Sequence, residues 1–347
     1  MTPSIAPEPL AAAAPSYVIE PSVVEDCRRI YASVQHELAK VIVGQNDVIE
    51  QILISILTKS HALLVGVPGL AKTLIISTLA DTLHLTFRRI QFTPDLMPSD
   101  ITGTEVIHQD PVSGLKEFKF HPGPLFCNIV LADEINRTPP KTQAAMLEAM
   151  QEKRVTVGGV TRELPQPFFV LATQNPLEQE GTYPLPEAQL DRFMFLIHVG
   201  YPARAEEIQI MKRGTGQICE KPQAVLDGDM IMRMQDTVKA LPVADHVYNY
   251  ALDIVRATRG KEEGSMEYCQ RYLSFGAGPR ASLNLIMAAK AHAMIHGQMY
   301  VGCANIVAVA PAIMRHRIAV NFSAQSEGIT PDDVIAKVLA TVPQHER

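Results

Sequence analysis

The chain has 347 residues, enough for about two domains, and 47% of them are apolar, enough to build a hydrophobic core. Its 31 basic and 37 acidic residues give a net charge of −6 and a pI near 6.0. No positive field is therefore available to attract a phosphate backbone or an anionic membrane, which argues against a nucleic-acid coat protein.

The first 60 residues divide into a tail and two helices. Residues 1–21 hold five prolines and an alanine run, which predicts a flexible tail. Apolar residues then recur every three or four positions over 23–40 and 48–59, as in amphipathic helices, with the short apolar connection 41–45 between them. The first basic residue, Arg28, comes too late for a secretory signal, and the five cysteines are scattered. We therefore expect a cytoplasmic protein.

Five segments predict strands, and most of them are continuous apolar runs rather than alternating ones, as is typical of strands that are covered on both faces. They cover residues 62–65, 86–92, 129–132, 168–172 and 193–199. Helical patterns lie between them, as is typical of a mainly parallel sheet. The predicted fold class is an α/β, three-layer αβα core with five parallel strands.

Two segments interrupt this alternation and predict inserted hairpins. Residues 105–120 hold two strand patterns around the turn 110–114, which contains proline and glycine. Residues 154–164 hold two more around Gly158-Gly159, a pair that suits a tight type I′ turn.

From residue 204 onward the apolar spacing is helical. The expected helices include residues 208–213, 230–239, 248–258, 281–295 and 303–318. The uncharged stretch 291–314 is long enough for a membrane span, but residues such as His296, Asn305 and Pro311 predict two buried helices with a turn instead. The predicted division is a tail over 1–21, a core over 22–203 and an all-helical lid domain over 204–347.

A phosphate-binding signature follows the first predicted strand. Gly66-Val67-Pro68-Gly69-Leu70-Ala71-Lys72-Thr73 leads into an apolar helix that begins at Leu74. In such a loop the backbone N–H groups bind phosphates, the lysine reaches the β- and γ-phosphates, and the threonine ligates Mg²⁺. Ala71 replaces the usual second glycine, at a position expected to be close-packed. Residues 66–74 are the predicted ATP site.

Two later strands end in groups that complete such a site. The strand over 129–132 ends in Asp133 and Glu134, at the edge where a parallel sheet presents ligand-binding residues. Asp133 is predicted to hold Mg²⁺ through water, and Glu134 to deprotonate the attacking water. Asn175 follows another strand and could hold that water; the alternative is an ordinary Asn-Pro turn.

Arg192 stands at the start of the fifth strand, at the opposite edge of the sheet from the predicted ATP site. A strand is roughly 17–20 Å long, beyond the reach of one side chain. If Arg192 is an arginine finger, it acts on a neighbouring subunit in a head-to-tail ring. The alternative is a surface salt bridge.

Three further features stand in the helical domain or beside the sheet. Arg280 begins a helix behind Gly278-Pro279 and could sense the γ-phosphate; the alternative is a surface arginine. His292 and His296 share one helix face, but no third metal ligand is evident, so two ordinary helix histidines are favoured. Arg88-Arg89 is interpreted as a solvated edge.

Together these motifs resemble the MoxR family of AAA+ ATPases over residues 41–317. The loop over 66–73 is similar to that family's own variant, alanine included. Similar stretches are Phe92 to Gly103, Ala132 to Arg137, Leu185 to Phe193, Pro279 to Ser282 and Arg315 to Arg317.

The resemblance implies Walker A over 66–73, Walker B at Asp133 and Glu134, sensor 1 at Asn175, an arginine finger at Arg192 and sensor 2 at Arg280. It leaves open whether Arg280 acts in its own subunit. The hairpins correspond to a helix-2 insert and a pre-sensor 1 hairpin. The resemblance also implies a ring, as a hexamer, and a chaperone role toward metalloenzyme complexes with a von Willebrand factor A (VWA) domain protein.

Three functional classes follow. The favoured class is an ATP-hydrolysing enzyme that remodels a protein client. A DNA-translocating motor is disfavoured, because the tip at Gly158-Gly159 lacks a lysine and the chain is acidic. A chelatase-like or scaffold subunit that binds ATP without fast turnover is disfavoured by the presence of Glu134 and Arg192. The excess of acid lies within residues 1–205, which carry both hairpins, so a protein partner is expected rather than nucleic acid.

Overall fold

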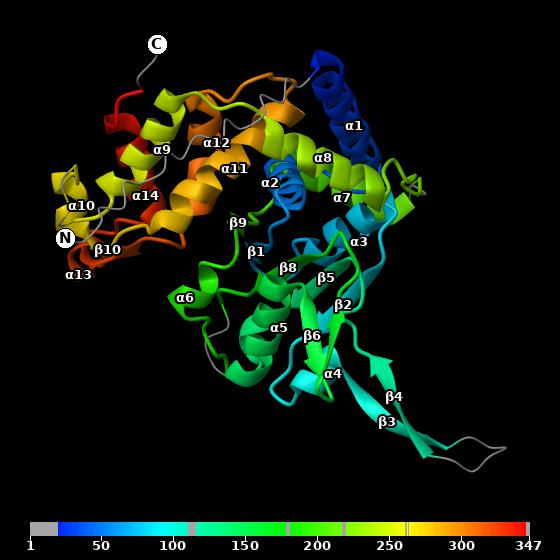
Figure 1. Cartoon of the computed structure of the whole chain (residues 1–347). Coiled ribbons are helices and arrows are strands. Elements are labelled where there is room, and N and C mark those ends of the chain that lie inside the picture. The colour runs from blue at the N-terminus through cyan, green and yellow to red at the C-terminus, as the bar shows by residue number, and fades with distance from the viewer. Residues whose placement is uncertain are drawn as a thin grey trace, which may run out of the picture.

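A computed structural model describes residues 20–109, 116–177, 181–216, 220–260, 262 and 264–344 (Figure 1). The predicted tail lies outside the described residues except for Glu20 and Pro21, and Pro21 begins the first helix. The turn over 110–114 also lies outside them.

The centre of the molecule is a parallel sheet of five strands, as predicted. The strands are β1 (Ala62–Val65), β2 (Phe87–Gln91), β5 (Ile129–Asp133), β8 (Phe169–Gln174) and β9 (Phe195–His198). Their order across the sheet is β2-β5-β8-β1-β9, and every pairing is parallel. The carboxyl ends of all five strands therefore lie at one edge, with β1 between β8 and β9.

Alternate residues of the strands enter two apolar clusters. On β5, Ile129 and Leu131 join the larger cluster, whereas Val130 and Ala132 join the smaller one. Helices α1 (Pro21–Ala39), α2 (Asn46–Leu57) and α3 (Lys72–Thr82) contribute to the larger cluster, and α5 (Pro140–Glu152) to the smaller. Helices thus cover both faces of the sheet, which is why the inner strands β1, β5 and β8 are continuous apolar runs for most of their length.

Both predicted hairpins are present. Strand β3 (Gly103–Gln109) pairs antiparallel with β4 (Lys116–Pro122) and follows the short helix α4 (Pro98–Thr102); this hairpin projects away from the body (Figure 1). Strands β6 (Arg154–Val157) and β7 (Val160–Glu163) form the second hairpin. Gly158 and Gly159 have φ of +60° and +78°, as a type I′ turn requires.

The C-terminal part is mainly helical. Its helices are α7 (Arg204–Gly216), α8 (Gly228–Ala240), α9 (Asp245–Ala257), α10 (Glu267–Tyr272), α11 (Pro279–Ile295), α12 (Cys303–Met314), α13 (Phe322–Ser326) and α14 (Pro331–Thr341). As predicted, the uncharged stretch divides into α11 and α12. Among the described residues, no helix is long and apolar enough to cross a membrane.

One detail differs from the all-helical prediction. Strands β10 (Leu273–Phe275) and β11 (Ala319–Val320) pair antiparallel within the helical part. Runs of two or three residues are too short to show a period of two, so the sequence pattern could not reveal them.

The helices before the sheet pack on the C-terminal helices. The larger apolar cluster runs without a break from α1 and α2 into α8, α11 and α12. Figure 1 shows α1 and α2 beside α8 and α11. This shared core fixes the position of the C-terminal helices relative to the sheet, while the division at residues 203 and 204 stays a prediction.

Candidate functional site

The loop over 66–71 connects the carboxyl end of β1 to α3, which begins at Lys72. Gly69 and Ala71 have φ of +86° and +56°. The expectation that position 71 is close-packed was wrong, because Ala71 is exposed. A glycine suits this position for its left-handed backbone, a conformation that costs alanine roughly 1–2 kcal/mol.

The lysine of the loop lies over the loop's own backbone. Lys72 Nζ donates hydrogen bonds to the carbonyl oxygens of Gly66 and Val67, the latter at 3.0 Å. Burial lowers the pKa of Lys72, and Asp133 and Glu134 oppose that shift. The ammonium group is therefore held next to both carboxylates, where it can neutralise a bound anion.

Asp133, the last residue of β5, is held on both sides. Thr173 Oγ1 donates to its Oδ1 at 2.6 Å. The guanidinium of Arg89 donates to Oδ2 through Nε at 3.0 Å and Nη2 at 2.6 Å. As predicted, Arg88 and Arg89 are exposed on β2, which is an edge strand of the sheet. The sequence did not reveal that parallel pairing puts Gln91 opposite Asp133, which brings Arg89 within reach of the carboxylate.

Glu134 follows in a left-handed conformation, with φ of +57°, and its N–H donates to Thr173 Oγ1 at 2.9 Å. Its carboxylate accepts from Gln91 Nε2 at 2.7 Å and lies 3.3 Å from Arg137 Nε. Arg89 also donates to Gln91 Oε1 at 2.6 Å. One polar network therefore links both carboxylates to β2.

A cavity of about 440 Å³, here called the P-loop cavity, brings most of the predicted site together. Its lining residues are Pro68, Gly69, Leu70, Ala71, Lys72, Thr73, Leu74, Arg89, Asp133, Glu134, Thr173 and Asn175. Gly66 and Val67 do not line it; they accept from Lys72 instead. Asn175 is buried and its Oδ1 accepts from the N–H of Leu177 at 3.1 Å, the local bond of an Asn-Pro turn.

The P-loop cavity fits an oxyanion and a hard cation. A Cβ added to Gly69 would meet nothing within 4 Å, so the backbone there is open to a close ligand. The N-terminus of α3 and Lys72 favour negative charge. The hydroxyl of Thr73 and the carboxylate of Asp133 are oxygen donors of the kind that Mg²⁺ prefers.

A second, apolar cavity of about 410 Å³ adjoins the first, since Gly69 to Ala71 and Leu74 line both. It is closed by residues 41–43, Gln45, Ile75, Pro202, Ile210, Arg213 and Gly214. The apolar connection 41–45 is visible in the sequence, but its place in a cavity is not, because α7 reaches this segment only in the folded chain.

Arg192 and Arg280 lie elsewhere. Both line a cavity of about 240 Å³ together with Lys59, Lys153 and Asp191, here called the basic cavity. It shares no lining residue with the P-loop cavity. Burial lowers the pKa of Lys153, and the nearby Lys59 lowers it further.

Asp191 anchors this region. Its Oδ2 lies 2.9 Å from Arg280 Nη1, and its Oδ1 lies 2.7 Å from Nε of the buried Arg317. Arg192 follows Asp191 and precedes β9, whose first residue pairs with the first residue of β1. Arg192 and Arg280 therefore lie at the amino edge of the sheet, opposite the P-loop, as predicted for Arg192.

Comparison with known proteins agrees with this arrangement. Residues 61–195 match the family described as "ATPase family associated with various cellular activities (AAA)", and residues 266–338 match the AAA lid domain. The chain is 45% identical over 306 residues to Chaperone MoxR1 of Mycobacterium tuberculosis, covering 88% of this chain and 80% of that protein.

Two further similarities extend over nearly the whole chain. Protein MoxR of Methylorubrum extorquens is 29% identical over 340 residues, covering 93% of this chain and 97% of that protein. A crystal structure from Cytophaga hutchinsonii aligns with a TM-score of 0.86 at 42% identity, covering 94% of this chain and 98% of that one.

Proposed function

The chain belongs to the MoxR family of AAA+ ATPases, and on that premise we propose that it hydrolyses Mg²⁺-ATP within a ring of its own copies to remodel a protein client. The observation that carries the proposal is the position of two charged cavities at opposite edges of one parallel sheet. A head-to-tail assembly brings such edges of neighbouring subunits together.

The nucleotide occupies the two adjoining cavities in this proposal. The base enters the apolar cavity beside residues 41–43 and Ile210, and the phosphates lie at the N-terminus of α3. Lys72, released from the carbonyl oxygens of Gly66 and Val67, turns to the β- and γ-phosphates. Because α7 lines the cavity for the nucleobase, nucleotide binding would be sensitive to the position of the C-terminal helices.

Thr73 and Asp133 are the residues that would hold Mg²⁺. The ion supplies neutralisation of the charge that develops on the transferred phosphoryl group. Arg89 donates two hydrogen bonds to Oδ2 of Asp133, so this ion pair has to open before Oδ2 can accept from another donor. Thr173 keeps the other oxygen in place throughout.

Glu134 is the proposed general base. Of the two carboxylates that line the P-loop cavity, Thr173 holds that of Asp133 and leaves that of Glu134. The Glu134 carboxylate accepts from Gln91 and contacts Arg137. Those partners hold the carboxylate in place beside the cavity, where it would take a proton from water. Asn175, at the end of β8, is the proposed group that orients the water.

Arg192 and Arg280 are proposed to act on the nucleotide of the neighbouring subunit. Neither reaches the P-loop cavity of its own chain, and the basic cavity that holds them has four cationic residues against Asp191. A polyphosphate is the natural complement of such a surface. We propose on this ground that Arg280, the sensor 2 residue, acts across the interface rather than in its own subunit.

The client and partner are proposed from family membership and surface chemistry. MoxR1 is named a chaperone. The β3–β4 hairpin exposes Ile107 and Phe118, apolar side chains that suit a protein contact. We therefore propose a protein client and a VWA-domain partner, with hexameric assembly in the cytoplasm.

A direct test compares Lys72→Ala with the control Lys337→Ala, which removes an exposed lysine of α14. We expect Lys72→Ala to abolish ATP binding in a calorimetric titration and phosphate release in a steady-state assay, while Lys337→Ala retains both. Unchanged ATP affinity in Lys72→Ala would remove the assignment of the loop. Stimulation of turnover by DNA would favour the translocating motor instead.

A further inference from the structure

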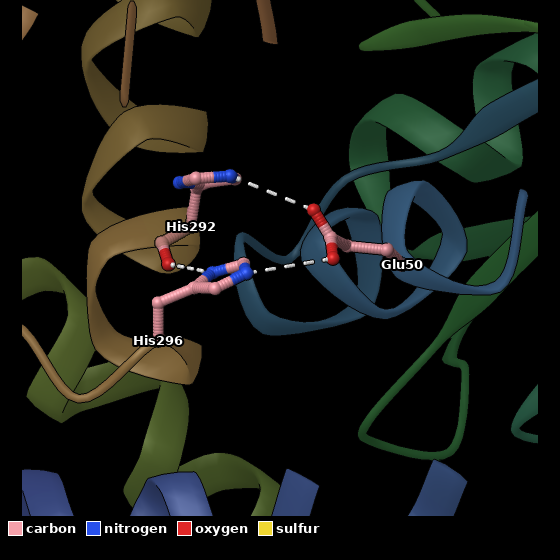
Figure 2. A group of neighbouring side chains, drawn as sticks. All are labelled: Glu50, His292 and His296. Atoms are coloured by element: carbon pink, nitrogen blue, oxygen red, sulfur yellow. Dashed lines mark hydrogen bonds and ion pairs between the residues drawn. The ribbon is translucent and has the colours of Figure 1, made fainter. Parts of the chain in front are cut away.

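Three side chains outside the nucleotide site meet where α2 and α11 pack together. His292 lies in the last turn of α11 and His296 is the C-cap residue of that helix. Their ring centroids are 4.3 Å apart, and both face Glu50 on α2 (Figure 2). His292 Nε2 is 3.5 Å from Glu50 Oε1, and His296 Nε2 is 3.8 Å from Glu50 Oε2. The carboxylate that lies where a third ligand would be is thus that of Glu50, 242 positions before His292 in the chain.

We propose that Glu50, His292 and His296 form a binding site for a divalent transition-metal ion such as Zn²⁺ or Co²⁺. Donor atoms that surround a tetrahedral Zn²⁺ lie about 3.4 Å from one another. The two nitrogen–oxygen separations are close to that value, and one donor atom from each of the three residues lies within 4.8 Å of the other two. Two imidazoles and one carboxylate suit Zn²⁺ or Co²⁺ better than Mg²⁺.

The surroundings of His296 and Glu50 prepare them as ligands. His296 Nδ1 lies 2.9 Å from the carbonyl oxygen of His292, to which it donates when the proton is on Nδ1. That tautomer leaves a lone pair on Nε2, the atom that faces Glu50. Tyr31 donates to Glu50 Oε2 at 3.0 Å and accepts from Gln35 at 2.7 Å, which fixes the carboxylate.

His292 has a different partner. Asn305 Nδ2 lies 3.0 Å from His292 Nδ1, while Asn305 Oδ1 accepts from the N–H of Gly302 at 2.8 Å. With Asn305 donating, the ring proton of His292 is on Nε2 and points at Glu50. Metal binding therefore requires this proton to move to Nδ1 and the Asn305 amide to offer an acceptor. Asn305 is a positioning residue that tunes the affinity of the site.

Burial and exposure are compatible with binding. The side chain of His292 is 16% exposed and that of His296 is 41% exposed, so an ion can enter from solvent and keep a water molecule in the fourth position.

An ion at this position would join the segment before the sheet to the C-terminal helices. Glu50 lies on α2, which begins at Asn46, directly after the segment whose residues 41–43 and Gln45 line the apolar cavity. The histidines lie on α11, which carries Arg280 at its other end. The metal would hold these two helices at one separation. This inference stands on the side-chain geometry and does not depend on the proposed ATPase site.

The test uses the full chain, treated with EDTA and dialysed, and titrated with Co²⁺ in excess Mg²⁺. We expect one tightly bound Co²⁺ per chain with the visible d–d absorption of tetrahedral coordination. His296→Ala and Glu50→Gln should each weaken Co²⁺ binding by about 100-fold or more, since loss of even an outer partner costs about 10- to 100-fold. Zn²⁺ should displace the Co²⁺ and abolish the absorption.

Two controls make the outcome decisive. His198→Ala removes a histidine that has one carboxylate neighbour, Asp332 at 3.9 Å, and should leave Co²⁺ binding unchanged. Asn305→Asp keeps an acceptor for the N–H of Gly302 and offers one to His292 Nδ1, so it should tighten binding by about 10-fold. Absence of saturable binding to the folded wild type would overturn the proposal, and so would a wild-type Co²⁺ affinity in Glu50→Gln or His296→Ala.

Discussion

Arg317 and Asp191 form an ion pair of 2.7 Å that ties the end of α12 to the residue before Arg192. The guanidinium of Arg317 also donates to backbone oxygens of Asp191, Ile313, Phe193 and Met194. Burial lowers the pKa of Arg317, while Asp191 opposes that shift. The pair therefore fixes the C-terminal helices against the amino edge of the sheet.

We expect Arg317→Met to lower the free energy of unfolding by about 3–5 kcal/mol, because it leaves buried carbonyl oxygens without a donor. Denaturant unfolding monitored by circular dichroism measures this change. The control is Arg280→Ala, which removes an exposed partner of the same Asp191 and should cost less than about 1 kcal/mol. Equal losses in the two variants would contradict the structural role of Arg317.

Glu134→Gln is expected to retain ATP binding and lose turnover. The amide has the same size and still meets Gln91 and Arg137, but it cannot accept the proton of water, so kcat should fall by about 10²- to 10⁴-fold. Parallel measurements of nucleotide affinity and phosphate release separate the two effects. Glu148→Gln, an exposed change on α5, is the matched control. Normal phosphate release by Glu134→Gln would rule it out as the base.

Mixed assemblies test whether Arg192 acts across an interface. Arg192→Ala and Lys72→Ala should each be inactive alone, since one lacks the finger and the other the phosphate-binding lysine. In a mixture, an interface that pairs an intact P-loop cavity with an intact Arg192 should regain activity. Phosphate release after co-assembly, with mixing verified by mass spectrometry, measures the recovery. The control is a variant that carries both substitutions. Mixed with Lys72→Ala it provides no intact P-loop cavity, so this mixture should remain inactive.

Stability should fall as the pH drops below 6.5, in part through His61. This ring is buried, accepts from the N–H of Val170 at 2.9 Å and lies 3.0 Å from the carbonyl oxygen of Met150. Burial lowers the pKa of His61 to about 4. The unfolded chain binds a proton below pH 6.5 and the folded chain only below about 4, so the stabilisation present above pH 6.5 is lost as the pH falls.

One such histidine accounts for about 2 kcal/mol between pH 7 and pH 5. Denaturant unfolding at several pH values measures the slope for the wild type and for His61→Gln, whose amide can donate to Met150 and accept from Val170. We expect a shallower slope in His61→Gln over pH 4.5–6.5 (roughly one proton less). An unchanged slope would show that other groups carry the pH dependence.

Sequence alone predicted the features that depend on local pattern. Most of the five strands were found because they are buried on both faces and are therefore largely apolar, as β1, β5 and β8 show. The loop over 66–73 was found because its chemistry lies within eight consecutive residues. Gly158-Gly159 predicted its turn because two left-handed residues in a row need glycine.

Only the tertiary structure decided which distant residues meet. The strand order puts β2 beside β5, and this pairing brings Arg89 to Asp133 and Gln91 to Glu134. The packing of α2 on α11 likewise brings Glu50 to His292 and His296. Periodicity reports the environment of a segment but not the identity of its neighbour. Contacts between residues far apart in the chain are therefore set by how the layers assemble. For this reason the cluster of Glu50, His292 and His296 is seen only in the tertiary structure.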